Sequence, residues 1–299
     1  MTRLVSILLV VPCLALASNV PDVPTATYRS SASEVRITFF ATDQNNRPVS
    51  DIREEDFAIV DDGMVIRNFR SLARSDETAL DLVVLLDTSE SVAPRFRETI
   101  REVRDLVAHS QFASEDNVSL VAFGGLRPVV ICRGNCHDAE AEQKLLSVRA
   151  AGPTPLFDAL SDGANLFTSR QTPGARPILV LFSDGGDTIS KTSAREAVEA
   201  IINSGALLYA VDVNPARTTR QSSLLERMAD ATGGRYFWFR DGAANPLRAA
   251  LDDLRASYIV TYPLPTHAIG FHSLRILPKH DLNLRFHCRD GYYYEPAIP

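Results

Sequence analysis

The most constraining feature of this chain is the aliphatic run Leu82–Leu86, which is followed directly by Asp87-Thr-Ser89-Glu-Ser91. Consecutive aliphatic residues without polar alternation are typical of a strand covered on both faces, as in the middle of a parallel sheet. Such sheets bind ligands at the carboxyl ends of their central strands. One carboxylate and two hydroxyls suit a hard divalent cation such as Mg²⁺ better than they suit zinc. Alternatively, the same residues only form the turn that ends the strand.

Two later segments have a similar character. Residues 177–182 predict a second strand buried on both faces, and Asp184 follows it within Ser-Asp-Gly-Gly-Asp-Thr, where the glycines let the backbone approach a ligand closely. Thr154 lies in Gly-Pro-Thr-Pro-Leu-Phe-Asp-Ala, and we expect it to cap a helix whose first position is Pro155. Capping alone would account for Thr154. The three segments therefore indicate a metal site only when they are taken together.

From Leu80 onward, predicted strands alternate with predicted helices. This alternation indicates the α/β class, with a doubly wound, mostly parallel sheet covered by helices on both faces. We expect helices near residues 94–107, 140–148, 155–167, 192–203, 222–232 and 246–254, and further strands at 118–123, 127–132, 207–213 and 235–239.

Both ends of the chain have the period-two pattern of half-buried strands instead. An early strand carries alternating apolar residues, and a hairpin is expected around Asp61-Asp62-Gly63. Late alternating residues are Tyr258, Val260, Tyr262, Leu274, Ile276, Leu282, Leu284 and Phe286. The early strands are too few to be stable alone, so we expect the α/β domain to be inserted in, or flanked by, a small β-sandwich built from both ends. The predicted division is a signal peptide at 1–17, a linker at 18–33, an N-terminal β segment at 34–76, the α/β domain at 77–256 and a C-terminal β segment at 257–299.

Residues 1–17 have the features of a secretory signal: Arg3, an apolar stretch over residues 4–16, and Ala15-Leu16-Ala17 as the cleavage site. No other segment is long and apolar enough to span a bilayer. Without the signal, the chain has 30 basic residues (31 less Arg3) and 37 acidic residues. This net negative charge argues against a nucleic-acid partner. We therefore expect an exported protein, periplasmic or extracellular, without membrane insertion after the signal is removed.

The cysteines and histidines suggest structural roles. Cys132 and Cys136 are expected to form a small disulfide in an exported protein, and the alternative, a zinc site with His137, lacks a fourth ligand. Cys288 shares a strand face with apolar neighbours, so we expect a buried free thiol. None of the six histidines is interpreted as a base or a ligand; they are His109, His137, His267, His272, His280 and His287.

Together, the segments that carry Asp87, Ser89, Ser91, Thr154 and Asp184 resemble the metal-ion-dependent adhesion site of von Willebrand factor type A (VWA) domains. The whole chain further resembles an exported bacterial subfamily of VWA-related proteins first described from Acidobacteria. The matching features include Asp62-Gly63, 232–235, 254–258 and 289–292. The resemblance implies that the two serines bind the cation directly, that Thr154 does so in the ligand-competent state, and that the aspartates act directly or through water. The implied ion is Mg²⁺, or else Mn²⁺ or Ca²⁺.

The resemblance and the chemistry of the site both favour binding over catalysis. Hydroxyls and waters leave the cation incompletely neutralised, so an acidic side chain of a protein partner can complete its coordination. We expect no enzymatic activity: Ser89 stands where a phosphatase would need a second aspartate, and the chain has no Gly-x-Ser-x-Gly elbow, Walker A loop or Gly-x-Gly-x-x-Gly motif. The remaining alternative is a cell-envelope scaffold that binds its partners without a metal.

Overall fold

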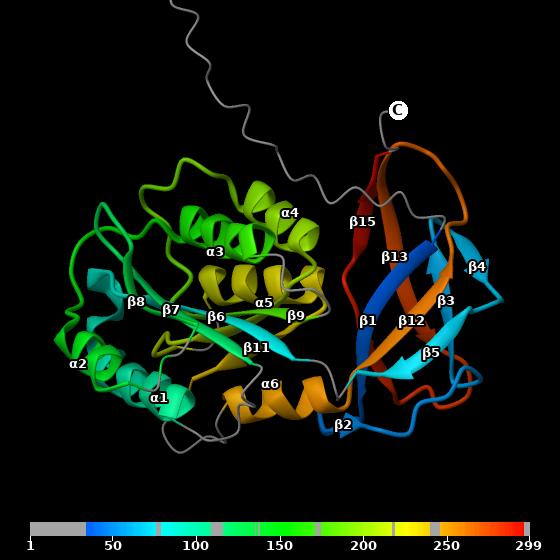
Figure 1. The fold of residues 1–299 in the computed structure, drawn as a ribbon, viewed down its shortest axis with the longest axis horizontal. Helices are drawn as coiled ribbons and strands as arrows, with labels where there is room; N and C mark the ends of the chain where they lie inside the picture. The colour runs from blue at the N-terminus through cyan, green and yellow to red at the C-terminus, as the bar shows by residue number, and fades with distance from the viewer. Residues whose placement is uncertain are drawn as a thin grey trace, which may run out of the picture.

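The computed structural model describes residues 34–75, 79–108, 116–134, 136, 138–170, 175–216, 219–239 and 246–295. An α/β domain lies beside a β-sandwich (Figure 1). The predicted signal peptide at 1–17 and linker at 18–33 lie outside the described residues. Within the described residues, no helix combines the length and the apolar composition that a membrane crossing requires.

The α/β domain is built on a six-stranded sheet with the order β11-β10-β9-β6-β7-β8. Its strands are β6 (Leu80–Asp87), β7 (Asn117–Phe123), β8 (Val129–Gly134), β9 (Arg176–Ser183), β10 (Leu207–Asp212) and β11 (Arg235–Trp238). All neighbours are parallel except β8, which runs antiparallel to β7. The chain passes from β6 to β7 on one side and places β9 on the other, so the strand order reverses between β6 and β9. Doubly wound sheets bind ligands at such a reversal, beyond the carboxyl ends of the strands.

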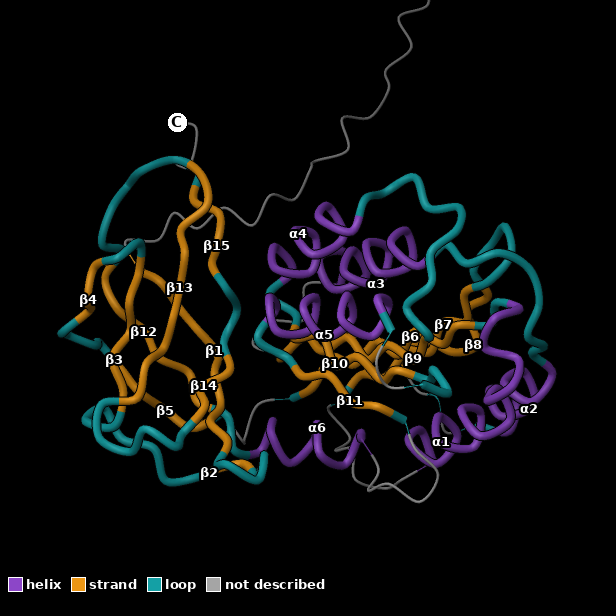
Figure 2. Tube along the Cα trace, turned by 180° about the vertical axis from the view of Figure 1, so that it is seen from behind, coloured by secondary structure: helices purple, strands orange, loops and turns teal. Residues whose placement is uncertain are grey.

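Helices cover both faces of this sheet (Figures 1 and 2). One face packs against α1 (Phe96–Ala108), which follows the short 3₁₀ helix η1 (Glu90–Arg95), and against α2 (Ala139–Ser147) and α6 (Pro246–Arg255). The other face packs against α3 (Leu156–Arg170), α4 (Ala194–Ser204) and α5 (Arg220–Thr232). Strand β6 explains this arrangement, because Leu82, Val84 and Leu86 enter the first core while Val83 and Leu85 enter the second. The prediction of a strand buried on both faces is confirmed.

The β-sandwich combines strands from both ends of the chain. One sheet has the order β14-β1-β12-β5, with β2 added to β1, and the other has the order β15-β13-β3-β4. The N-terminal strands are β1 (Glu34–Thr42), β2 (Pro48–Val49), β3 (Phe57–Asp61), β4 (Met64–Ile66) and β5 (Ser71–Arg74). The C-terminal strands are β12 (Tyr258–Pro263), β13 (Gly270–Pro278), β14 (Arg285–His287) and β15 (Gly291–Tyr294). Because β1 pairs with β12 and β3 pairs with β13, each sheet joins the two ends, and the predicted sandwich is confirmed.

The two domains are joined where the chain enters and leaves the α/β domain. The backbone N–H of Ser75 donates to the carbonyl of Ser257 over 2.9 Å, which places the entry and exit segments side by side. On another side of the junction, the hydroxyl of Tyr293 in β15 donates to Glu199 in α4 over 2.9 Å. Hydrogen bonds therefore join the sandwich to the α/β domain both at the connecting segments and between β15 and α4.

Several local predictions can be compared with the structure. The hairpin at Asp61-Asp62-Gly63 is confirmed: β3 pairs with β4, and Asp62 (φ 46°) and Gly63 (φ 80°) have left-handed backbone conformations. Leu282, by contrast, was wrongly placed in a strand. It is 78% exposed, because the strand β14 begins only at Arg285 and the chain before it turns on the surface.

The cysteine predictions are also resolved. Cys132 and Cys136 form a disulfide, with their Cα atoms 5.4 Å apart. The alternative zinc site is therefore wrong, because its two thiolates are joined to each other; its third ligand, His137, lies outside the described residues. Cys288 is a free thiol as predicted, but it is half-buried and follows the end of β14. It packs against the sandwich core, and desolvation of the thiol raises its pKa to about 12.

Candidate metal centre

The candidate metal centre begins at the carboxyl end of β6, where Asp87 is 1% exposed. Its Oδ1 atom accepts a hydrogen bond from the backbone N–H of Ser89 over 2.8 Å, and its Oδ2 atom accepts one from the hydroxyl of Ser183 over 2.7 Å. Both carboxylate oxygens are thus fixed by a neighbour. Ser183 was not singled out from the sequence; the only available signal was its place beside Asp184 at the end of β9.

Ser89 and Ser91 lie on the turn that follows β6. Their hydroxyl oxygens are 3.1 Å apart. Ser89 occupies the N-cap position of η1, but its side chain does not cap that helix. The alternative that Asp87, Ser89 and Ser91 form the turn that ends the strand agrees with the bond from the Ser89 N–H to Asp87, and the two serine hydroxyls are hydrogen-bonded to each other.

Thr154 precedes α3, which begins at Leu156, and its side chain is buried (3% exposed). The prediction that Thr154 caps this helix is wrong. Asp187 instead accepts from the backbone N–H of Leu156 over 2.9 Å, and Ser190 accepts from that of Phe157 over 3.0 Å. Among the described residues, the Thr154 hydroxyl has no hydrogen-bond partner, so it remains available to a ligand.

Backbone hydrogen bonds hold the three segments together. The N–H of Glu90, between the two serines, donates to the carbonyl of Gly152 over 3.0 Å. The N–H of Thr188, beyond Asp184, donates to the carbonyl of Thr154 over 2.9 Å. The loops after β6 and β9 and the loop before α3 therefore form one structure at the sheet edge where the strand order reverses.

The electrostatics of the site show an excess of negative charge. Burial raises the pKa of Asp87 to about 6, although hydrogen bonds from Ser183 and Ser89 lower it, and the charge of Asp184 adds to the increase. Asp184 is half-buried, and its Oδ1 atom accepts from the N–H of Gly186 over 2.9 Å. Two carboxylates within range of each other, two adjacent serine hydroxyls and the hydroxyl of Thr154 on a hydrogen-bonded neighbouring loop match the oxygen-rich donor set of a hard divalent cation.

Other acidic residues nearby have structural partners. Asp158 accepts from the backbone N–H groups of Lys191 and Thr192, and these bonds lower its pKa even though partial burial raises it. Asp187 holds the start of α3, as described above. Glu90 is exposed. Asp158 and Asp187 therefore stabilise the loops around the site, and Glu90 is a solvated charge.

The comparison with known proteins decides the family. Residues 81–252, more than half of the chain, match the sequence model of the von Willebrand factor type A domain. The chain belongs to the VWA domain family. The matched residues run from β6 into α6, so the VWA domain is the α/β domain and the sandwich lies outside it.

Relatives and solved structures with similar folds come from diverse sources. The 67 kDa magnesium-chelatase subunit of Chlorobaculum parvum is 26% identical over 62% of this chain, which spans about a third (32%) of that relative's length. A VWA protein from Catenulispora acidiphila has a TM-score of 0.44 at 15% identity, covering 83% of this chain and 76% of that one. Manganese-loaded TRAP protein from Plasmodium vivax has a TM-score of 0.46 at 15% identity, covering 79% of this chain and 99% of that one.

One further group of side chains was missed by sequence analysis. His272, which we did not interpret as a ligand, is 1% exposed and lies beside Asp61 and Asp62 in the sandwich. The signal available from the sequence was weak: an Asp-Asp-Gly turn, and a histidine far away in an alternating strand. The position of His272 emerges only from the pairing of β3 with β13.

Proposed function

We propose that the VWA domain binds a protein partner through a divalent cation held by Ser89, Ser91 and Thr154, with Asp87 and Asp184 acting directly or through water. The supporting observation is the pair of adjacent serine hydroxyls, 3.1 Å apart, at a helix start that neither caps. This spacing is close to that of neighbouring oxygen ligands on a six-coordinate Mg²⁺, which binds oxygens at about 2.0–2.1 Å. The cation is Mg²⁺ or Mn²⁺, with Ca²⁺ as the larger alternative.

The partner contributes an acidic side chain. Uncharged hydroxyls supply most of the direct ligands, so the ion keeps positive charge that a carboxylate from outside can neutralise. Ser91 and the adjacent Glu90 are exposed, and this rim of the site is therefore accessible to another protein. The role of the VWA domain would be recognition rather than catalysis.

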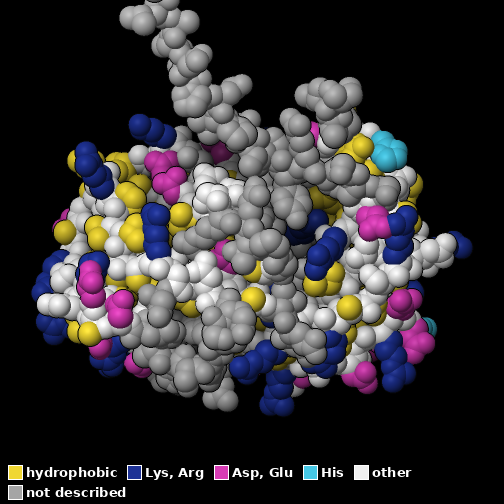
Figure 3. All heavy atoms as spheres, in the orientation of Figure 1, with side chains coloured by type: hydrophobic (Ala, Val, Ile, Leu, Met, Phe, Trp, Pro, Cys, Tyr) yellow, Lys and Arg dark blue, Asp and Glu magenta, His cyan; other side chains and the backbone are white. Residues whose placement is uncertain are grey.

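The proposal extends to where the protein works. A disulfide between Cys132 and Cys136 favours an oxidising compartment, which agrees with the signal-like residues 1–17 and with a periplasmic or extracellular location. On the face drawn in Figure 3, basic and acidic side chains lie interspersed among the described residues. Such a mixed surface favours a protein partner over a polyanion such as nucleic acid.

The metal site is tested with Mn²⁺ titrations of the full chain by electron paramagnetic resonance. Ser91→Ala removes one proposed ligand at an exposed position, and we expect it to weaken Mn²⁺ binding at least tenfold. Ser169→Ala, an exposed serine on α3, is the matched control and should bind as the wild type does. Equal Mn²⁺ affinity in Ser91→Ala and wild type would contradict the ligand set.

The binding function is tested separately. Immobilised wild-type protein and the Ser91→Ala variant are incubated with cell-envelope extract in Mg²⁺ or in EDTA. A partner retained only by the wild type and only with Mg²⁺ supports metal-dependent recognition. Partners retained equally under all four conditions would favour the alternative of a metal-independent envelope scaffold.

A further inference from the structure

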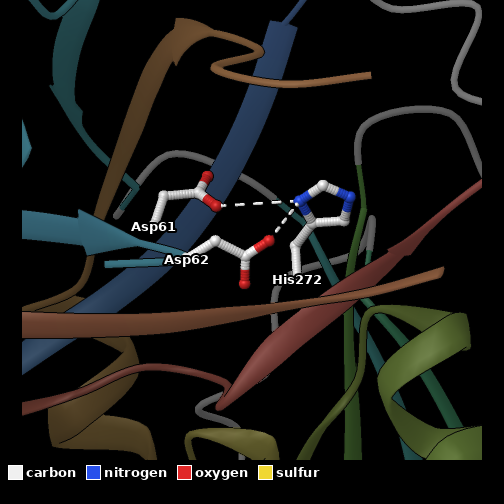
Figure 4. Close-up of side chains that lie close together, drawn as sticks. All are labelled: Asp61, Asp62 and His272. Carbon is white, nitrogen blue, oxygen red and sulfur yellow. Dashed lines mark ion pairs between the residues drawn. The ribbon is translucent and has the colours of Figure 1, made fainter. Parts of the chain in front are cut away.

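A second cluster of ligand-type side chains lies in the β-sandwich, apart from the VWA site. Asp61 ends β3, Asp62 begins the hairpin turn, and His272 lies on the neighbouring strand β13. The Nδ1 atom of His272 is 3.0 Å from Oδ2 of Asp62 and 4.0 Å from Oδ1 of Asp61. Figure 4 shows one oxygen of each carboxylate facing this nitrogen.

The outer oxygen of Asp61 is held by two tyrosines. Its Oδ2 atom accepts hydrogen bonds from the hydroxyl of Tyr262 over 2.7 Å and from that of Tyr292 over 3.0 Å. Tyr262 belongs to the opposite sheet and Tyr292 to the same one, so the carboxylate is fixed from both layers. The inner atom, Oδ1, is thereby turned towards His272.

Asp62 and His272 are oriented in the same manner. The Oδ1 atom of Asp62 accepts from the backbone N–H of Ser273 over 2.8 Å and from its hydroxyl over 3.2 Å. The Nε2 atom of His272 lies 2.7 Å from the carbonyl of Ala268, which can only accept, so Nε2 carries a proton. The ring also stacks on Tyr292, with centroids 5.0 Å apart. Each of the three side chains thus has one atom fixed by a neighbour and one atom directed inwards.

Two of the three inward atoms lack a hydrogen bond within the described part of the chain. Among the described residues, Nδ1 of His272 and Oδ1 of Asp61 are buried and have no hydrogen bond. The side chains of these two residues are 1% and 0% exposed. An imidazole that carries its proton on Nε2 alone presents a lone pair at Nδ1, which then meets the lone pairs of the two carboxylate oxygens. An imidazole protonated on both nitrogens would instead form an ion pair with Asp62 over 3.0 Å. Buried polar atoms normally have a partner, which points to a group that belongs at this point.

We propose that Nδ1 of His272, Oδ1 of Asp61 and Oδ2 of Asp62 bind a divalent transition metal, with Zn²⁺ as the best match. The three atoms all lie within 4.8 Å of one another, so small side-chain rotations bring them to Zn–N and Zn–O distances of about 2.0–2.2 Å. An imidazole ligand favours zinc over Mg²⁺ or Ca²⁺, and two carboxylates neutralise its charge. The hydrogen bonds that hold the far sides of these three side chains are of the kind that orients metal ligands in proteins. The side chain of Asp62 is 34% exposed, which leaves a path for the ion and room for a water ligand.

The metal would join segments that are far apart in the chain. The proposed ligand Asp62 and Ser273, the residue after the proposed ligand His272, are separated by 211 positions. A metal here ties the hairpin of the N-terminal segment to a strand of the C-terminal segment. This role is independent of the proposed adhesion function, and either proposal can fail without the other.

Asp62→Asn tests the site without disturbing the fold. Asparagine tolerates the left-handed backbone at this position and can still accept from Ser273, but it loses the ligand charge. The full chain is titrated with Co²⁺, whose visible absorption reports coordination by protein ligands, and Zn²⁺ is then added in competition. We expect a Co²⁺ absorption spectrum that Zn²⁺ abolishes in the wild type, and at least a tenfold weaker affinity for the ion that gives this spectrum in Asp62→Asn.

Two controls separate this site from other carboxylates and from the VWA site. Asp51→Asn changes an 86% exposed acid of the same N-terminal segment, and Ser91→Ala changes the VWA site; both should keep the Co²⁺ spectrum. Zn²⁺ should also raise the melting temperature of the wild type more than that of Asp62→Asn. The proposal is overturned if the wild type gives no Co²⁺ spectrum, or if Asp62→Asn gives the same one. It is also overturned if ¹⁵N NMR shows His272 as an imidazolium that excess Zn²⁺ does not displace.

Discussion

Substitutions of Thr154 and Asp187 should affect metal affinity and domain stability separately. Both residues lie at the start of α3, but their side chains have different roles there. Asp187 accepts from the N–H of Leu156, whereas the hydroxyl of Thr154 caps nothing. Removing a capping acceptor costs about 1–2 kcal/mol. Asp187→Ala should therefore lower the free energy of unfolding of the VWA domain by about 1–2 kcal/mol, which corresponds to a melting temperature lower by about 2–8 °C for a domain of this size.

Thr154→Val is the complementary change. Valine keeps the shape of the buried threonine side chain (3% exposed) and removes only the hydroxyl, which has no partner among the described residues. We expect no decrease in the free energy of unfolding, because the substitution removes a buried hydroxyl that makes no hydrogen bond within the described part of the chain. The affinity for Mn²⁺ should fall at least tenfold, because valine cannot act as a ligand.

The assay can be confined to the VWA domain. Trp238 is the single tryptophan of the chain and lies in β11, where its indole N–H donates to Asn214 over 2.9 Å. Urea unfolding followed by tryptophan fluorescence therefore reports this domain and not the sandwich. If Thr154→Val destabilises the domain as much as Asp187→Ala does, the hydroxyl has a structural partner. If it leaves Mn²⁺ binding intact, Thr154 is not a ligand.

Three further predictions concern pH, packing and domain organisation. Burial, with contributions from Arg235 and Arg285, lowers the pKa of His287 to about 4. As pH falls, the imidazole of His287 is therefore protonated in the unfolded chain before it is protonated in the folded one. The free energy of unfolding decreases as pH falls from about 6.5 towards 4, by at most about 1.4 kcal/mol per pH unit. Calorimetry at pH 7, 6 and 5 should show a smaller loss for His287→Gln than for the wild type, and equal losses would contradict this assignment. Gly124→Ala should disturb the turn after β6 that carries Asp87, Ser89 and Ser91, because a Cβ at position 124 would lie 2.7 Å from the backbone carbon of Thr88. We expect a loss of about 1–3 kcal/mol and weaker Mn²⁺ binding, and wild-type values for both would show that the turn adapts freely. Truncation after Ala256 removes the partners of β1 and β3, so residues 34–75 should become protease-sensitive while a fragment of residues 79–256 still folds. Protease resistance of residues 34–75 in the truncated protein would argue against the shared sandwich.

The predictable part of the fold is the part encoded locally. The uninterrupted aliphatic run of β6 and the short-range turn at Asp62-Gly63 depend on residues close together in the chain, and both were predicted correctly. The convergence of the segments around Asp87 and Asp184 was also predictable, because parallel strands end at the same edge of a sheet, whereas Thr154 joins them through the loop before α3.

The missed features depend on contacts between distant segments. Local propensity assigned Thr154 as a cap, but Asp187 reaches the same helix from the loop after the next strand, β9, and takes that role. Nothing near His272 in the sequence indicates that β13 places it beside Asp61. The exposure of Leu282 has the same origin, since alternation predicts a buried face only where another sheet covers it.

The side-by-side entry and exit of the VWA domain has a mechanical consequence. Ser75 and Ser257 are hydrogen-bonded neighbours, and β5 and β12, which lead to them, are paired strands of one sheet. A pulling force between residues 34 and 295 is therefore carried by the sandwich and largely bypasses the VWA domain. A force applied through a ligand at the end of β6 would instead run along that strand to the junction. The two directions of load would thus unfold different domains first.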